Sequence, residues 1–221
     1  MSDLSGYFPL SQRPKRDETA VTNNWAKARG TILLELAGLL GELDPADWEL
    51  PGLRPGWTVR DVAGELVWLA GSGWASRASR VWGRSLAERR GPAEAAKSFA
   101  REQHGDLPAQ LHAIAIDDLA PNTRRSVRDL SPAVVAAFEL STALGRPVSI
   151  DPIASGAVAL ARGLGGPVEV RAVTSVRTLV ATDADWRVGR GPELPGTAAA
   201  LVLFLFGRTR PPEQGRYAFA G

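Results

Sequence analysis

The sequence predicts a mainly helical α+β protein, in which a helical bundle precedes a small C-terminal domain of about three strands and a buried helix. Three observations support this class. Stretches before residue 165 repeat apolar side chains every three or four positions, which is the spacing of one helix face. Residues 167–189 alternate and are rich in β-branched side chains, as strands are. Residues 197–208 are almost wholly apolar, so a helix there must be covered on most sides.

The expected organisation is an irregular arm at 1–16, a bundle at 17–165 and a small α+β domain at 166–221. The first bundle helix is predicted over 17–43 from its apolar periodicity. Its glycines would weaken an exposed helix, and close helix packing would explain them. These glycines are Gly30, Gly38 and Gly41.

A loop with three prolines, 43–57, separates this helix from the second. Thr58 is the predicted start of the second helix, because Asp61 three residues later resembles a capping box. A third helical stretch is predicted over 92–119, with a break near 105–108.

Ser131 and Pro132 are the predicted N-cap and first turn of the fourth helix, since serine and proline favour these positions. Gly145 is its predicted stop. A short helix follows over 150–166. Strands are then expected at 167–173, 175–182 and 186–189, with a turn at 183–185, before the apolar helix at 197–208.

The composition excludes several classes of site and partner. The chain has 221 residues, no cysteine and a formal net charge of +2. Disulfides, thiolate nucleophiles and Cys-ligated metals are therefore absent, and the interspersed charges differ from a nucleic-acid-binding surface. No apolar run approaches the ~20 residues of a membrane span, and the first 18 residues lack a signal-peptide core. We expect a cytoplasmic protein with neither nucleic acid nor membrane as partner.

The sequence contains no complete metal site or known catalytic motif. Its two histidines, His104 and His112, are eight residues apart, with Asp117 and Asp118 downstream. A zinc site needs three convergent ligands, and no third ligand is close in sequence. We therefore expect two partly exposed histidines on a bundle helix and no bound metal.

Two glutamates within apolar helical segments are the main candidates for chemistry. Glu65 lies in DVAGELVWLAG and Glu139 in AAFELST. A buried carboxylate needs a partner or its pKa rises. Glu65 would either reach solvent, pair with a bundle arginine, or act as a general base or metal ligand.

Tryptophans gather around the second helix, and they have two interpretations. They are core packing residues of the bundle, or they form an aromatic wall beside a ligand. In the second interpretation Trp68 and Trp74 would line a pocket together with His112. The four tryptophans are Trp57, Trp68, Trp74 and Trp82.

Three segments, in consistent order, resemble the mycothiol-dependent maleylpyruvate isomerase-like family, part of the wider DinB-like group of helical bundles. PGWTVRDVAGELVWLAG (Pro55–Gly71) resembles the opening of that family's second helix, and ELSTALGRPVSIDP (Glu139–Pro152) the end of its fourth. The segment Ser175–Arg208 is similar to its small appended domain. The resemblance implies a DinB-like four-helix bundle and a place in actinobacterial small-molecule metabolism.

The resemblance also implies a divalent metal that holds mycothiol, a thiol cofactor. The second-helix histidine of the family falls at Glu65, and the glutamate and histidine of its fourth helix fall at Pro132 and Ala136. The acidic residue after that pair is kept as Glu139. Proline and alanine carry no donor atom in the side chain, so the usual ligands are lost.

Three functions follow as hypotheses. The first is a repurposed, metal-independent enzyme in which Glu65, Glu139 and Arg80 carry the chemistry. The second is a non-catalytic module that binds a small ligand or a protein. The third is a metal- and mycothiol-dependent isomerase or S-transferase with a rebuilt metal site. In each case a small molecule is the expected partner, and a homodimer is left open.

Overall fold

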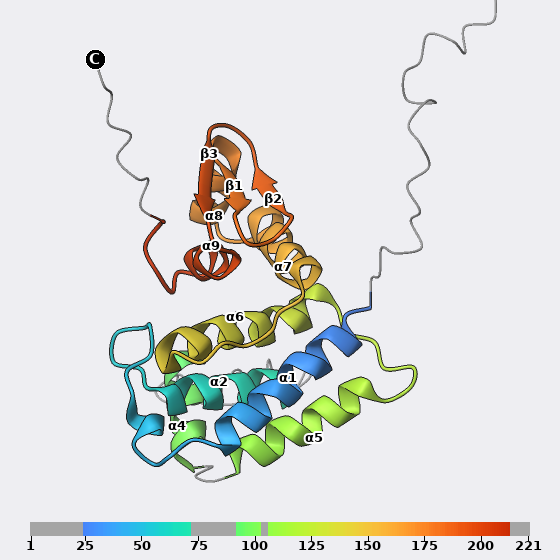
Figure 1. Cartoon of the computed structure of the whole chain (residues 1–221), viewed down its shortest axis with the longest axis vertical. Coiled ribbons are helices and arrows are strands. Elements are labelled where there is room, and N and C mark those ends of the chain that lie inside the picture. The colour runs from blue at the N-terminus through green and yellow to red at the C-terminus, as the bar shows by residue number, and fades with distance from the viewer. Residues whose placement is uncertain (1–23, 72–91, 103–105, 213–221) are drawn as a thin grey trace, which may run out of the picture.

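A computed structural model of the chain describes residues 24–71, 92–102 and 106–212. It confirms the mainly helical α+β class. Figure 1 shows α6 between the other bundle helices and the elements that follow residue 152, which we term the C-terminal unit. The bundle comprises α1 (Ala26–Gly41), α2 (Val59–Gly71), α4 (Pro92–Glu102), α5 (Leu107–Leu119) and α6 (Val127–Leu144). The C-terminal unit comprises α7 (Pro152–Gly165), α8 (Val168–Val176), β1 (Thr178–Ala181), β2 (Arg187–Gly189), β3 (Glu193–Gly196) and α9 (Ala198–Leu205).

Helix α1 begins later than its periodicity predicts. Asn24 and Trp25 are not helical, and α1 starts at Ala26. The predicted helical residues 17–23 and the predicted arm at 1–16 lie outside the described residues. The side-chain oxygen of Asn24 accepts hydrogen bonds from the N–H groups of Ala26 and Arg125, both at 3.1 Å. The start of α1 is therefore attached to the loop between α5 and α6.

Helix α2 begins as predicted. The Asp61 carboxylate accepts a hydrogen bond from the Thr58 N–H at 3.0 Å, and the Thr58 hydroxyl accepts one from the Asp61 N–H at 3.3 Å. This reciprocal pair is a capping box. In the preceding loop the short 3-10 helix η4 (Asp47–Glu49) packs against α2.

The predicted break in the third helical stretch is confirmed, since α4 ends at Glu102 and α5 begins at Leu107. The predicted start of the fourth helix at Ser131 is wrong. Helix α6 begins one turn earlier, at Val127, because Ser126 and Asp129 form a capping box there. Pro132 is therefore inside the helix. Helix α6 stops at Leu144, and Gly145 is its C-cap, as predicted, with a φ of 64°.

The strand predicted at 167–173 is a helix. Pro167 occupies the N-cap of α8, and Glu169 lies in its first turn, where a carboxylate favours the helix dipole. Thr174 is 8 % exposed, and its hydroxyl lies 3.2 Å from the carbonyl oxygen of Gly163 near the end of α7. Helix α8 therefore packs back on α7, and this packing overrides the β propensity of its valines.

The sheet of the C-terminal unit has the strand order β2-β1-β3. Strand β1 pairs antiparallel with β2 and parallel with β3. Leu179 pairs with Val188 on one side and Leu194 on the other, which aligns three buried side chains on one face. The sequence predicted β1 and β2 but not β3.

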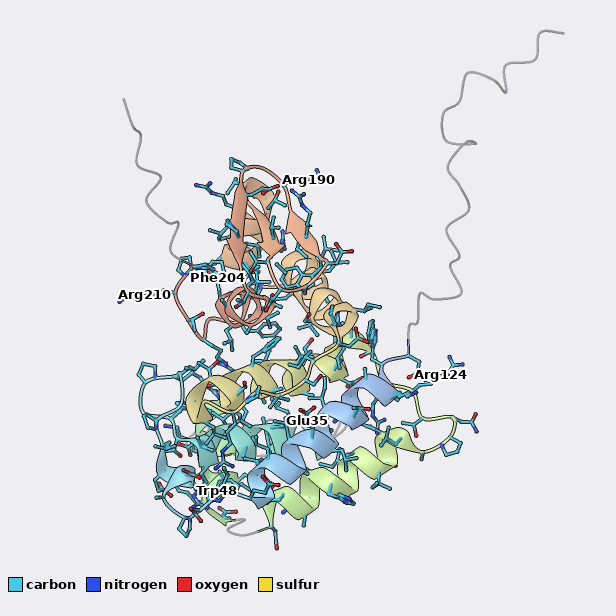
Figure 2. All side chains as sticks on the ribbon, viewed as in Figure 1. Glu35, Trp48, Arg124, Arg190, Phe204 and Arg210 are labelled. Carbon is cyan, nitrogen blue, oxygen red and sulfur yellow. The ribbon has the colours of Figure 1, made fainter. Side chains whose placement is uncertain are left out.

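The last helix, α9, contacts β1, α7 and α6. The Thr197 hydroxyl caps it by accepting a hydrogen bond from the Ala200 N–H at 3.2 Å. Leu201 and Val202 are fully buried, as the apolar sequence of α9 requires. Side chains occupy the space between α9 and α6 in Figure 2, with Phe204 labelled on α9.

Close helix contacts account for some bundle glycines. A Cβ on Gly30 would lie 2.8 Å from Leu119 of α5, and one on Gly64 would lie 2.3 Å from the Cβ of Ala100 in α4. Gly38 has open space around it. None of the helices in the described ranges is both long and apolar enough to cross a membrane.

Candidate functional site

A cavity of about 230 Å³ lies where α2, α6 and the chain segment after α9 meet. Helix α6 contributes a continuous stripe to its wall, because residues spaced by three and four share one helix face. The two remaining walls come from one face of α2 and from the residues that follow α9. The lining residues are Glu65, Leu66, Leu69, Arg128, Ser131, Pro132, Val135, Ala136, Glu139, Phe206 and Arg208.

The positions to which the family resemblance assigns metal ligands all line this cavity. Glu65 lies on α2, and Pro132 and Ala136 lie along the stripe of α6. Glu139, the acidic residue that follows this pair, lies on the same stripe. The structure brings Glu65 and Glu139 together and joins them through two arginines.

These four side chains, Arg54, Glu65, Glu139 and Arg208, form what we term the Arg–Glu cluster. Arg54 binds Glu65 through two hydrogen bonds, of 3.0 and 2.6 Å, and donates from Nε to Glu139 at 3.1 Å. Arg208 donates from Nη2 to Glu65 at 3.3 Å. Its Nε lies 3.2 Å from Glu139 Oε2. Each guanidinium therefore bridges both carboxylates.

The two glutamates of the cluster differ in exposure. The Glu139 side chain is 1 % exposed and the Glu65 side chain 19 %. Burial raises the pKa of the Glu139 carboxyl above its usual range, and the positive charges of Arg54 and Arg208 oppose that rise. Glu139 is thus the interior member of the cluster, whereas Glu65 is the member closer to solvent.

Both arginines are held in place by their surroundings. The guanidinium carbon of Arg54 lies 3.2 Å from the centre of the Trp57 ring, a cation–π contact. Arg208 follows Gly207, whose φ of 68° turns the chain at the end of α9. The Arg208 N–H donates to the Leu203 carbonyl at 2.8 Å, which fixes the direction of this segment. The Arg208 Nε is buried and has no hydrogen bond of acceptable geometry within the described residues.

The donor set of the cavity does not fit the divalent metal that the resemblance implies. A catalytic zinc site takes three protein ligands. Pro132 and Ala136 offer no side-chain donor, and both cluster carboxylates are engaged by guanidiniums. In the part of the chain that the structure describes, no three His, Cys, Asp or Glu side chains gather as metal ligands. Metal-activated mycothiol chemistry therefore cannot be derived from these residues.

Of the remaining predicted site residues, the two that the structure describes are not brought to the Arg–Glu cluster. Trp68 lines a separate cavity of about 310 Å³ between α2, α4 and α5. His112 is exposed on α5. Arg80 and Trp74, together with His104 and Trp82, lie outside the described residues.

Sequence reasoning did not find Arg54 and Arg208. Both lie outside regular elements, Arg54 in the proline-containing loop and Arg208 after the last helix. A buried carboxylate needs a cationic partner, so the sequence indicated that some arginine would pair with these glutamates. It did not indicate which arginine.

Comparison of the chain with protein-family models, curated proteins and solved structures finds no match.

Proposed function

We propose that this chain is a divergent member of the maleylpyruvate isomerase-like group, built on a DinB-like bundle, that binds a small organic molecule beside the Arg–Glu cluster without a metal. One observation carries this proposal. The positions that would hold a metal in that group converge on one cavity, where Arg54 and Arg208 lie between the carboxylates. Two guanidiniums supply the same total charge as one divalent cation.

The composition of the cavity wall supports ligand binding. Apolar side chains from α2, α6 and the segment after α9 surround a few polar groups, as is usual for small-molecule sites. An engineered apolar cavity of about 150 Å³ holds benzene. A cavity of about 230 Å³ therefore has room for a small ring compound.

Filling the cavity tests the proposal. Ala136 is 6 % exposed and lines the cavity, so Ala136→Leu would occupy its volume. We expect small aromatic compounds to shift NMR resonances of the wild type and to lose that effect in Ala136→Leu. Ala113→Leu is the matched control, because Ala113 lines the separate cavity beside Trp68.

Two outcomes would contradict metal-independent binding. One is that every compound that binds the wild type binds Ala136→Leu equally well, which would place the ligand outside this cavity. The other is a stoichiometric divalent metal in the purified protein that is lost in Glu65→Gln. NMR titration of Ala136→Leu tests the first outcome, and elemental analysis of the wild type and Glu65→Gln tests the second.

Acid–base catalysis on the bound molecule is the second candidate function. The observation that favours it is that Glu65 lines the cavity, since a general acid or base must be within hydrogen-bond reach of the bound molecule. Its carboxylate is already engaged by Arg54 and Arg208 and would have to give up hydrogen bonds to reach a substrate, so binding is the better supported function. Glu65→Gln would abolish turnover of an identified substrate while leaving its binding intact.

A further inference from the structure

A second cavity, of about 570 Å³, adjoins the first. It lies between the start of α6 and the end of α7, and it shares Arg128, Ser131 and Phe206 with the cavity beside the Arg–Glu cluster. The two cavities therefore form one groove between the bundle and the C-terminal unit. The ring of Phe206 lies where they meet.

The charges along this groove are unequally compensated. Near the Arg–Glu cluster, two arginines face two glutamates. The wall of the larger cavity contains Arg128 and Arg162 and no acidic side chain. Across the described ranges, neither arginine has an ion pair. The groove therefore carries two uncompensated positive charges at this end.

Arg162 is held in a fixed orientation. Its Nε donates a hydrogen bond to the Leu205 carbonyl at 3.2 Å, and its guanidinium carbon lies 4.6 Å from the centre of the Phe206 ring. The side chain is partly buried, and burial together with the nearby charge of Arg208 lowers the Arg162 pKa from its usual range. Desolvating a cation beside another cation is costly unless an anion joins them.

We propose that Arg128 and Arg162 bind an oxyanion group, a carboxylate or a phosphate, of the ligand whose apolar part occupies the smaller cavity. Planar guanidiniums bind such oxygens through paired, charge-assisted hydrogen bonds. Phe206 lines both cavities, and its ring contacts the Arg162 guanidinium, so it would lie between the oxyanion and the apolar part of the ligand. This inference rests on the proposed function for the apolar part, whereas the oxyanion site can be tested without it.

The experiment compares benzoate, its neutral counterpart benzyl alcohol, and inorganic phosphate by NMR titration at low ionic strength. We expect benzoate to bind at least tenfold more tightly than benzyl alcohol. Arg162→Gln and Arg128→Gln should each weaken benzoate about tenfold, the usual effect of losing a charged hydrogen bond, and leave benzyl alcohol unchanged. Arg190→Gln removes the same charge from the far end of the C-terminal unit (Figure 2) and should have no effect.

The outcomes separate the two proposals. Equal binding of benzoate and benzyl alcohol, or equal weakening by all three arginine variants, would overturn the oxyanion site but leave cavity binding intact. Phosphate binding that Arg162→Gln removes, without binding of either ring compound, would support the oxyanion site and contradict the cavity proposal. No binding of any probe at millimolar concentration would contradict both. A preference for phosphate over benzoate would identify the ligand as a phosphate ester.

Discussion

Glu139 is the residue on which the bundle and the C-terminal unit converge. Its carboxylate is buried in α6 and is contacted by Arg54 from the loop before α2 and by Arg208 from the segment after α9. Removing one partner of such a buried ion pair usually destabilises a protein more than replacing the whole pair by apolar residues, because an unpaired charge stays buried. Burial nevertheless dominates, since the Glu139 pKa is raised despite two adjacent cations.

The raised pKa of Glu139 makes a prediction with a definite sign. The folded protein keeps this proton to a higher pH than the unfolded chain, so stability falls as pH rises from about 4.3, the unfolded value, through the folded pKa. Glutamine does not ionise. The wild type should therefore lose stability relative to Glu139→Gln as pH rises toward neutrality, by about 1.4 kcal/mol for each pH unit that separates the folded pKa from the unfolded one.

Urea unfolding of both proteins from acid to neutral pH measures this difference. Ile153→Ala, at a side chain that is 68 % exposed, is the control. It removes no titratable group, so it should differ from the wild type by a constant at every pH. A wild type that gains stability over Glu139→Gln with rising pH would show that the arginines lower the Glu139 pKa.

The two glutamates of the Arg–Glu cluster could be predicted from the sequence, whereas their arginine partners could not. Glu65 and Glu139 were identifiable because a charged residue inside an apolar helical pattern is conspicuous in any sequence. Their partners were not, since Arg54 is 85 residues from Glu139, and Arg208 is 143 residues from Glu65. Such pairings depend on how helices and loops are placed in space, which periodicity within one element does not determine.

At the scale of elements, capping residues predicted two helix boundaries correctly and one wrongly, since α6 is capped by Ser126 rather than by Ser131. Thr58 and Asp61 correctly predicted the start of α2, and Gly145 the end of α6. The prediction of a strand at 167–173 is wrong because the contacts of this segment with neighbouring elements, rather than its own residue preferences, make it the helix α8. The Arg190 N–H in the turn after β2 donates to the Thr174 carbonyl at 2.9 Å, an acceptor that the last turn of α8 leaves free.

Alanine should have opposite effects at two helical glycines, one of which lies at the contact between α2 and α4 and the other of which faces open space. Gly64→Ala would place a methyl group 2.3 Å from the Cβ of Ala100, so the helices must separate, at a cost of about 1–3 kcal/mol. Gly38→Ala in α1 meets no atom within 4 Å and should stabilise by up to about 1 kcal/mol through helix propensity. Thermal unfolding of both variants checks the pair, and equal shifts would contradict the packing at Gly64.

At the scale of the whole molecule, the bundle and the C-terminal unit share one core. Helix α6 packs on α1 and α2 on one side and on α7 and α9 on the other (Figure 1). The sequence predicted two successive units from the change in pattern near residue 166. It did not predict their contact, since no pattern within either unit describes how the two surfaces meet.

The shared core predicts that a defect in α9 is felt throughout the protein. Leu201 is fully buried, so Leu201→Ala should lower the free energy of unfolding by about 2–5 kcal/mol. Because α9 packs on α6, the far-UV circular dichroism and tryptophan fluorescence transitions in urea should shift together. Ile153→Ala, at a side chain that is 68 % exposed, should change stability by less than about 0.5 kcal/mol. Transitions that separate in Leu201→Ala would show that the two units unfold independently.

The position of Arg208 in the chain has a consequence for protein synthesis. Glu65 and Glu139 are translated before Arg208, which lies 143 residues downstream of Glu65. During that interval Arg54 is the sole cation of the cluster for two carboxylates, and one of these must be buried when α6 docks. Domains generally fold in the order in which they are translated. Here the first unit to emerge reaches its final charge balance only after the last helix has been translated and has docked.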